Sequence, residues 1–232
     1  PQKENINRTL CTKMELIKKD LAIMLSREEK RCHLIGFNPV TQEIIWEVPI
    51  DDVLIDAPVI INNTIFLTSN RIAQKDKGAP TIYAFDINGR ILFIKDFERD
   101  NNEQSVFINI IEEYSKISND ASNILLSFNK IQGNSTTYME LAAINTKTEK
   151  TSWISEKIKL SFRSNTEIML INTANTELLL LLLNEDIVAL NNKTGEKVWH
   201  NNFPNSMIAK SYNQKILVYN RNEKNGVIWD PI

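Results

Sequence analysis

The chain repeats one short phrase four times, and this repeat restricts its possible folds more than any other feature. Each copy begins with an apolar residue followed by Asn or Asp, continues through a polar turn, and ends in an aromatic residue. The copies run from Phe37 to Trp46, Phe85 to Phe93, Ile144 to Trp153 and Leu190 to Trp199. The closing aromatic residues lie roughly 47, 60 and 46 residues apart. Strand-rich repeats of this length indicate propeller blades or a related array.

Each phrase is interpreted as a β-hairpin. A strand such as 186–190 enters the turn, and a second strand leaves it towards the aromatic residue. Asn, Asp, Thr, Lys and Gly in the turn either tolerate its backbone geometry or hydrogen-bond to their own backbone. A single sheet of this size cannot bury both of its faces, so the sheets are expected to stack as blades.

Further strands are expected around the repeats. They precede the phrases at 57–69, 122–129 and 176–184, and one more hairpin follows at 215–229. The six leucines within 176–184 are too few to span a membrane, which takes about 20 apolar residues. Leucine is not a preferred strand residue, so a short buried helix is the competing interpretation. The register of the repeat favours a central strand that is buried on both faces.

The pattern apolar–Asn/Asp–x–x–Thr–Gly–x–x–x–Trp resembles the repeat of PQQ-like (pyrroloquinoline-quinone-like) β-propellers. The match is best at Leu190 to Trp199 and weakest at Ile144 to Trp153, where Glu149 replaces the glycine. The resemblance covers residues 31–232. It implies an all-β fold: a β-propeller, complete or partial, of about four to five four-stranded blades. Glycine is scarce for this family, at 6 in 232 residues, which indicates a divergent member.

Propellers of seven or eight blades need more than 232 residues at about 45 per blade. A processed product, a truncated chain, a partial propeller and a closed five-bladed propeller are therefore all open interpretations. The aromatic residues at the repeat position are the expected structural anchors: Trp46, Phe93, Trp153, Trp199 and Trp229. Trp46, Trp153 and Trp199 are expected to be largely buried at equivalent blade positions, and stacking on a cofactor is the disfavoured alternative.

Residues 1–30 are predicted to form a separate helical segment, with the helix over roughly 8–29. A stripe with heptad spacing runs along it: Leu10, Met14, Ile17, Leu21 and Met24. The stripe either docks on the propeller or forms a partner-binding helix. A charged insertion at about 98–121 lengthens the second period and is expected to be a loop with a helix, a type of segment that often carries binding.

Composition excludes some classes of function. A hydrophobic content of 42% with 24% charged residues fits a globular protein with a sizeable core. The net charge of −2 argues against binding to nucleic acid or to anionic membranes. No membrane span and no signal peptide are visible in the sequence. Cys11 and Cys32 are expected to be free thiols rather than a disulfide.

Residues that carry chemistry are few. His33 and His200 are the only histidines, and each is expected to be a surface or packing residue. Adjacent carboxylates, such as Glu185 and Asp186, face opposite ways on a strand and make poor acid–base pairs. The sequence contains no metal-ligand set with zinc-like spacing, no glycine-rich phosphate loop and no nucleophile elbow. We therefore predict no catalytic residue, no bound metal and no cofactor.

Three functions follow as hypotheses. The favoured one is a non-catalytic propeller that recruits protein partners into a larger complex through its loops or an open blade edge. The second is a receptor domain that senses a peptide or a small ligand. The third, a fragment of a quinone-dependent dehydrogenase, is disfavoured because the vicinal cysteines and the acidic calcium set of that family are absent. The resemblance also implies a lean towards the bacterial cell envelope or periplasm, since its members include scaffold lipoproteins of outer-membrane assembly alongside luminal domains of stress-sensing kinases.

Overall fold

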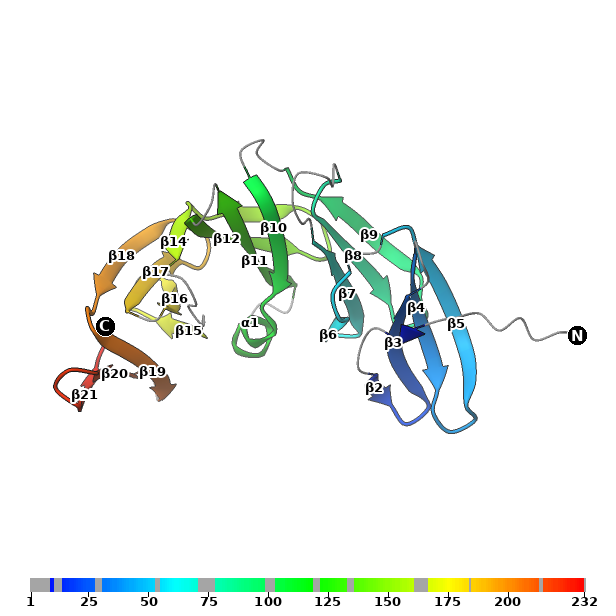
Figure 1. The fold of residues 1–232 in the computed structure, drawn as a ribbon, viewed down its shortest axis with the longest axis horizontal. Coiled ribbons are helices and arrows are strands. Elements are labelled where there is room, and N and C mark those ends of the chain that lie inside the picture. Colours follow the sequence, from blue (N-terminus) through cyan, green and yellow to red (C-terminus); the bar gives the residue numbers. More distant parts are fainter. Residues whose placement is uncertain are drawn as a thin grey trace, which may run out of the picture. The chain divides into compact units, whose positions relative to one another are not determined.

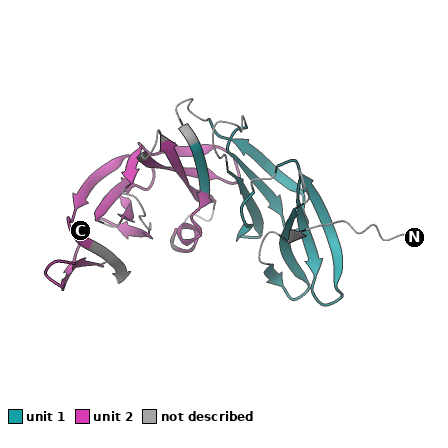
Figure 2. Cartoon of the chain, in the orientation of Figure 1, with its two compact units in different colours: residues 1–108 teal, residues 109–232 magenta. Residues whose placement is uncertain are grey.

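The protein is a succession of antiparallel sheets, shown in Figure 1 as a computed structural model. The structure describes residues 9–10, 14–27, 31–52, 55–70, 78–98, 103–118, 122–132, 136–160, 167–183, 185–212 and 215–231. Residues 1–108 and 109–232 form two compact units, coloured separately in Figure 2. These described residues form five sheets, which we number as blades in chain order. The predicted all-β propeller architecture is confirmed.

The blades are built from consecutive strands joined mostly by hairpins. Blade 1 contains β1 (Thr9–Leu10), β2 (Glu15–Lys18), β3 (Leu21–Arg27), β4 (Cys32–Asn38) and β5 (Glu43–Ile50). Blade 2 contains β6 (Val59–Ile61), β7 (Thr64–Ser69), β8 (Thr81–Asp86) and β9 (Ile91–Asp96). Blade 3 contains β10 (Glu103–Ile110), β11 (Asn123–Gln132), β12 (Thr136–Asn145), β13 (Thr151–Ile154) and β14 (Ile158–Leu160).

The second unit continues with two more blades. Blade 4 contains β15 (Glu167–Asn172), β16 (Glu177–Leu183), β17 (Asp186–Asn191) and β18 (Lys197–Asn202). Blade 5 contains β19 (Ser206–Tyr212), β20 (Lys215–Asn220) and β21 (Asn225–Trp229). Among the described residues the one helix is α1 (Glu112–Ile117), and at six residues it is too short to cross a membrane.

One turn recurs in all five blades, directly before the strand that carries the aromatic residue. Its first residue is Asn or Asp, and the side-chain Oδ1 accepts hydrogen bonds from two later backbone N–H groups at distances between 2.8 and 3.3 Å. These first residues are Asn38, Asp86, Asn145, Asn191 and Asn220. The side chain replaces a backbone acceptor in the turn, which is why the repeat retains Asn or Asp here.

The same turn later contains a residue in the left-handed backbone region. Its φ is 60° at Gln42, 78° at Gly89, 61° at Glu149, 73° at Gly195 and 52° at Lys224. Glycine adopts this conformation without a steric penalty, whereas a residue with a Cβ does not. Three of the five turns therefore hold a residue in a conformation that its side chain disfavours.

The repeat aromatics occupy equivalent places in the first four blades. Each lies opposite a small residue on the neighbouring strand, immediately before a β-bulge. The pairs are Gly36 with Trp46, Ala84 with Phe93, Ala143 with Trp153, and Ala189 with Trp199. Trp229 departs from this arrangement because it lies opposite Ile216. Phe93 and Trp153 are buried, while Trp46, Trp199 and Trp229 are only partly buried.

Two of these tryptophans connect one blade to the turn of the next. The indole N–H of Trp46 donates to the carbonyl of Ile87 at 3.2 Å, and that of Trp153 donates to the carbonyl of Asn192 at 2.9 Å. In both cases the ring lies against the glycine of the same turn, Gly89 or Gly195. The glycine is needed there for closeness of approach as well as for its positive φ.

Blade 4 packs on blades 3 and 5 through the two faces of its central strand β16. In β16, Leu179, Leu181 and Leu183 face a core shared with blade 3, while Leu178, Leu180 and Leu182 face a core shared with blade 5. All six leucines are buried. The prediction of a central strand buried on both faces is confirmed, and the alternative of a buried helix is wrong.

The predicted N-terminal helix is wrong, because residues 15–18 and 21–27 are the strands β2 and β3. β3 pairs with β4 from Ala22 to Arg27, so this segment belongs to blade 1 rather than to a helical region. Of the predicted stripe, Leu21 is buried, Ile17 and Met24 are partly buried, and Met14 is exposed. Leu10 lies in β1. The stripe therefore does not form one continuous surface.

The expected insertion at 98–121 is also different in the structure. It contains β10, the first strand of blade 3, in addition to the expected helix, which is the short α1. Val106 lies on β10 and is buried, and Tyr114 on α1 is buried in the core of blades 3 and 4. Its hydroxyl donates to Asn192 Oδ1 at 3.0 Å. This segment thus completes a blade.

Candidate partner-binding site

A pocket opens in the second unit between blades 3 and 4. Its apolar lining comes from Ile158 on β14, Leu183 on β16 and Val188 on β17, all of which belong to one buried core. The cavity volume is about 140 Å³. A cavity of about 150 Å³ accepts a benzene-sized group, whereas sites for drug-sized ligands and cofactors usually span about 300–1,000 Å³. The size suits one apolar side chain better than a cofactor.

Charged and polar side chains surround this apolar lining. They are Glu156, Lys157, Lys159, Asp186, Lys197 and His200. Lys197 on β18 forms an ion pair with Glu156, which follows β13, so the pair joins the two blades across the pocket. Lys157 and Lys159 are exposed on the β14 side. An apolar centre with a polar rim is the arrangement found at the anchor points of protein interfaces.

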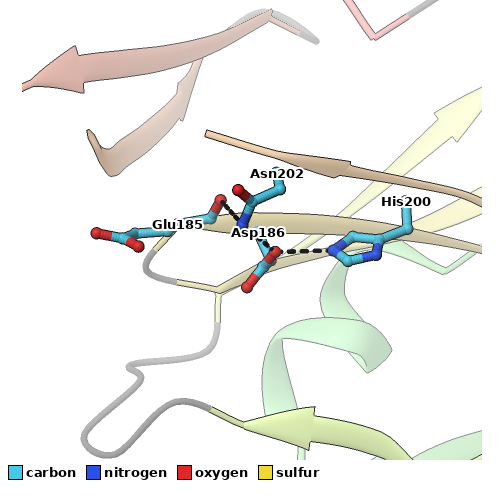
Figure 3. A network of polar contacts seen from close by, with 4 residues as sticks. All are labelled: Glu185, Asp186, His200 and Asn202. Atoms are coloured by element: carbon cyan, nitrogen blue, oxygen red, sulfur yellow. Dashed lines mark hydrogen bonds and ion pairs between the residues drawn. The ribbon is translucent and has the colours of Figure 1, made fainter. Parts of the chain in front are cut away.

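Asp186 organises a polar network at one side of the pocket (Figure 3). Its Oδ1 lies 2.8 Å from His200 Nε2 and accepts a hydrogen bond of 2.7 Å from the Asn202 side-chain amide. The same amide nitrogen lies 3.4 Å from the carbonyl oxygen of Glu185. The network fixes the orientation of His200 beside the pocket.

The strand register explains why these residues meet. Asp186 on β17 lies directly opposite Asn202 on β18, and Val188 lies opposite His200. Residues two apart on a strand share a face, so all four lie on the face of blade 4 that borders the pocket. The sequence showed Asp186 only as a neighbour of Glu185. The cross-strand partners could not be read from spacing because they depend on the pairing register.

The other predicted site residues lie elsewhere. His33 is buried in blade 1, with Nδ1 2.7 Å from Glu47 Oε1, so it is a packed, paired histidine as expected. Cys32 is a buried thiol that forms no disulfide, while Cys11 lies outside the described residues. Trp46, Phe93, Trp153, Trp199 and Trp229 do not line the pocket.

The chemistry open to the pocket is limited. The Asp186–His200 pair can hold or transfer a proton, but none of the described residues that line the pocket is Ser, Thr or Cys, so the pair has no hydroxyl or thiol to activate. Within the described ranges no three His, Cys, Asp or Glu side chains are grouped to hold a metal ion. The arrangement is suited to recognition of an apolar group flanked by charges.

The chain resembles known proteins in its three-dimensional structure. No protein-family model and no curated protein sequence matches the chain. The solved structure of BamB from Moraxella catarrhalis is 16% identical with a TM-score of 0.38, covering 94% of this chain and 72% of that one. The quinohemoprotein alcohol dehydrogenase ADHIIG from Pseudomonas putida HK5 is 10% identical with a TM-score of 0.46, covering 97% and 44%.

A third solved structure is the β-propeller domain of the Trilobed protease from Pyrococcus furiosus. It is 14% identical with a TM-score of 0.45, and the alignment covers 95% of this chain and 68% of that one. The present chain thus spans less than half of the dehydrogenase and about two thirds to three quarters of the other two. The chain's own sheets, with their recurring turns and bulges, are those of a β-propeller.

Proposed function

We propose that this protein is a non-catalytic β-propeller scaffold that binds protein partners, with the pocket between blades 3 and 4 as one docking point. The observation that carries this proposal is the combination of an apolar lining from Ile158, Leu183 and Val188 with a rim of paired and exposed charges. Interface energy concentrates where a side chain of one protein enters such a pocket on the other.

The charges at the rim indicate the partner's chemistry. Among the lining residues, Glu156 and Asp186 carry two negative charges, and Lys197, which pairs with Glu156, offsets one of them. Lys157 and Lys159 add two positive charges on the exposed side. An apolar side chain flanked by Asp or Glu is therefore the partner segment that fits best. Because these charges lie at a rim, they should act mainly on the association rate and its salt dependence.

A pair of charge reversals tests the proposal. Affinity purification from the native extract, followed by cross-linking, should recover a stable partner with contacts at the pocket. The double variant Lys157→Glu/Lys159→Glu should lose that partner. The matched control Lys147→Glu/Lys150→Glu changes the same charges at exposed positions in the Asn145 turn of blade 3 and should retain it. Equal capture by both variants, or enzymatic turnover that His200→Ala abolishes, would contradict the proposal.

The cell envelope is the location we propose, from the resemblance of the repeat to that of PQQ-like scaffold proteins. Neither nucleic acid nor lipid is proposed as a partner, because the net charge of −2 provides no general attraction to polyanions.

A further inference from the structure

In the part of the chain that the structure describes, blade 5 has no counterpart of the strand that begins each of the other blades. Its strands pair in the order β19–β20–β21, and among the described residues β19 pairs on one side only. In the other blades the corresponding strand pairs on both sides; for example, β7 lies between β6 and β8, and β16 lies between β15 and β17.

Hydrogen bonds identify β19 as the equivalent of a second strand. In blade 4, the N–H of Asn192, the second residue of the turn that begins at Asn191, donates to the carbonyl of Glu177 at the start of β16. In blade 5, the N–H of Arg221, the second residue of the turn that begins at Asn220, donates in the same way to the carbonyl of Asn205, immediately before β19. The matching contact in blade 3 joins Thr146 to Ser122, immediately before β11. The missing element is therefore the first strand.

The segment between β18 and β19 is too short to contain a first strand for blade 5. Residues 51–63, 97–122 and 161–176 separate the last strand of one blade from the second strand of the next, and each segment includes the first strand. Between β18 and β19 there are only residues 203–205. These residues form a tight turn, in which the N–H of Ser206 donates to the carbonyl of Phe203 at 3.1 Å.

We propose that the open edge of β19 binds an extended segment of a partner polypeptide, which completes blade 5 as an antiparallel first strand. This inference rests on the proposed binding role but concerns a different surface from the pocket. The first strands present in the molecule define the occupant. In blades 2 and 4 these strands are β6, three residues long, and β15, six residues long; both are antiparallel to their neighbours and rich in apolar side chains.

The edge is suited to a short occupant. The register of β19 shifts between Ile208 and Lys210, so a bulge divides the strand into two short stretches. Such bulges limit uncontrolled association of edge strands while still allowing a short segment to pair. Strand addition of this kind obtains its affinity from main-chain hydrogen bonds and its specificity from alternate side chains.

A synthetic peptide of residues 166–173, which contains β15, is the probe. Hydrogen exchange on the full chain should show new protection of the β19 amides when the peptide is added. A copy of the peptide with N-methyl groups on alternate amides cannot form the ladder and should bind at least about tenfold more weakly. Protection confined to β16, or no protection at millimolar peptide, would overturn the inference.

Two variants at one position separate backbone pairing from side-chain packing. Ser206 N–H points away from β20, and residues two apart on a strand point the same way, so Ile208 N–H also lies on the open side. Ile208→Pro removes this donor and should abolish peptide binding, whereas Ile208→Ala retains it and should bind. Circular dichroism and thermal unfolding of both variants check that blade 5 remains folded.

Two further results decide the source of the occupant. If the β19 amides of the protein alone become protected as its concentration rises, together with dimer formation in sedimentation, a second copy fills the edge and the inference is wrong. The pocket variant Lys157→Glu/Lys159→Glu should bind the peptide as wild type does. If the pocket proposal fails, the result for β19 therefore still stands. If the peptide does not bind β19, the pocket proposal likewise still stands.

Discussion

Trp153 and Gly195 are in such close contact that a Cβ on the glycine would lie 2.4 Å from Cε3 of the indole ring. The ring belongs to blade 3 and the glycine to the turn that begins at Asn191 in blade 4. The indole N–H donates to Asn192 in that same turn, so both the ring and the turn are held in place. This contact joins two blades at the repeat position.

We expect Gly195→Ala to lower the free energy of unfolding by about 2–4 kcal/mol, through the left-handed backbone and the forced contact with Trp153. Denaturant unfolding measures the change. Gly226→Ala is the matched control, since the nearest atom to its Cβ would be the end of the Leu217 side chain, at 3.2 Å, and its φ is not positive. Equal losses for the two variants would contradict the role of the Trp153 contact.

Trp153→Ala should cost about 3–5 kcal/mol of stability, in the range of large-to-small changes of buried aromatic residues. Trp199→Ala should cost less, because Trp199 is partly exposed and packs edge-on against Trp229 with ring centroids 5.6 Å apart. Thermal unfolding of both variants under one set of conditions gives the comparison. A larger loss of stability for Trp199→Ala than for Trp153→Ala would contradict the expectation that the more buried tryptophan contributes more.

Glu149→Gly should stabilise the protein by about 0.5–1 kcal/mol, because it relieves a positive φ that glycine adopts freely. The gain is small since glycine also increases the entropy of the unfolded chain. Glu149→Ala is the control, as it removes the same carboxylate but keeps the Cβ that causes the strain. Chemical denaturation should rank the glycine variant above wild type and above the alanine variant.

Asp86 should make stability depend on pH in the acid range. Desolvation raises the pKa of this carboxyl, but hydrogen bonds from the backbone N–H groups of Arg90 and Asn88, together with the Asn88 side chain and the Arg90 charge, bring it below its ordinary value. A lowered pKa in the folded state means that the stabilisation is present above about pH 4, the unfolded value, and is lost as the pH falls through the folded value.

Asp86→Asn tests this dependence while preserving the turn, since the other four turns have Asn at this position. The stability difference between wild type and variant should be largest near neutral pH and should shrink below about pH 4. Urea unfolding at several pH values measures it. A difference that stays constant from pH 7 to pH 3 would show that the charge of Asp86 does not contribute.

Local features were predictable from the sequence because they depend on neighbouring residues. The hairpins, the Asn or Asp turns and the doubly buried leucine strand β16 all follow from side chains within about ten residues of one another. The open edge of β19 also has a local cause, in the three residues that separate it from β18. A segment of that length cannot hold a strand together with the turns that would connect it on either side.

The stripe from Leu10 to Met24 shows where local pattern fails. Its spacing is helical, yet β3 is a strand because it pairs with β4 from Ala22 to Arg27 and buries Leu21, Ile23 and Leu25 in one core. The pairing with β4 is local, but the burial comes from residues distant in the sequence, such as Ile65, Leu67 and Phe85 in the same core. Together they outweigh the helical preference of a short isolated stretch.

The candidate site depended on tertiary structure altogether. Ile158, Leu183 and Val188 come from three strands in two blades, and the contact of Asp186 with His200 exists only in one register of β17 and β18. Sequence determined the repeating unit, its turns and its anchor aromatics, since those depend on short-range hydrogen bonds and backbone geometry. Tertiary structure alone decided the pocket and the fate of the N-terminal stripe, because both arise from packing between segments that the sequence keeps apart.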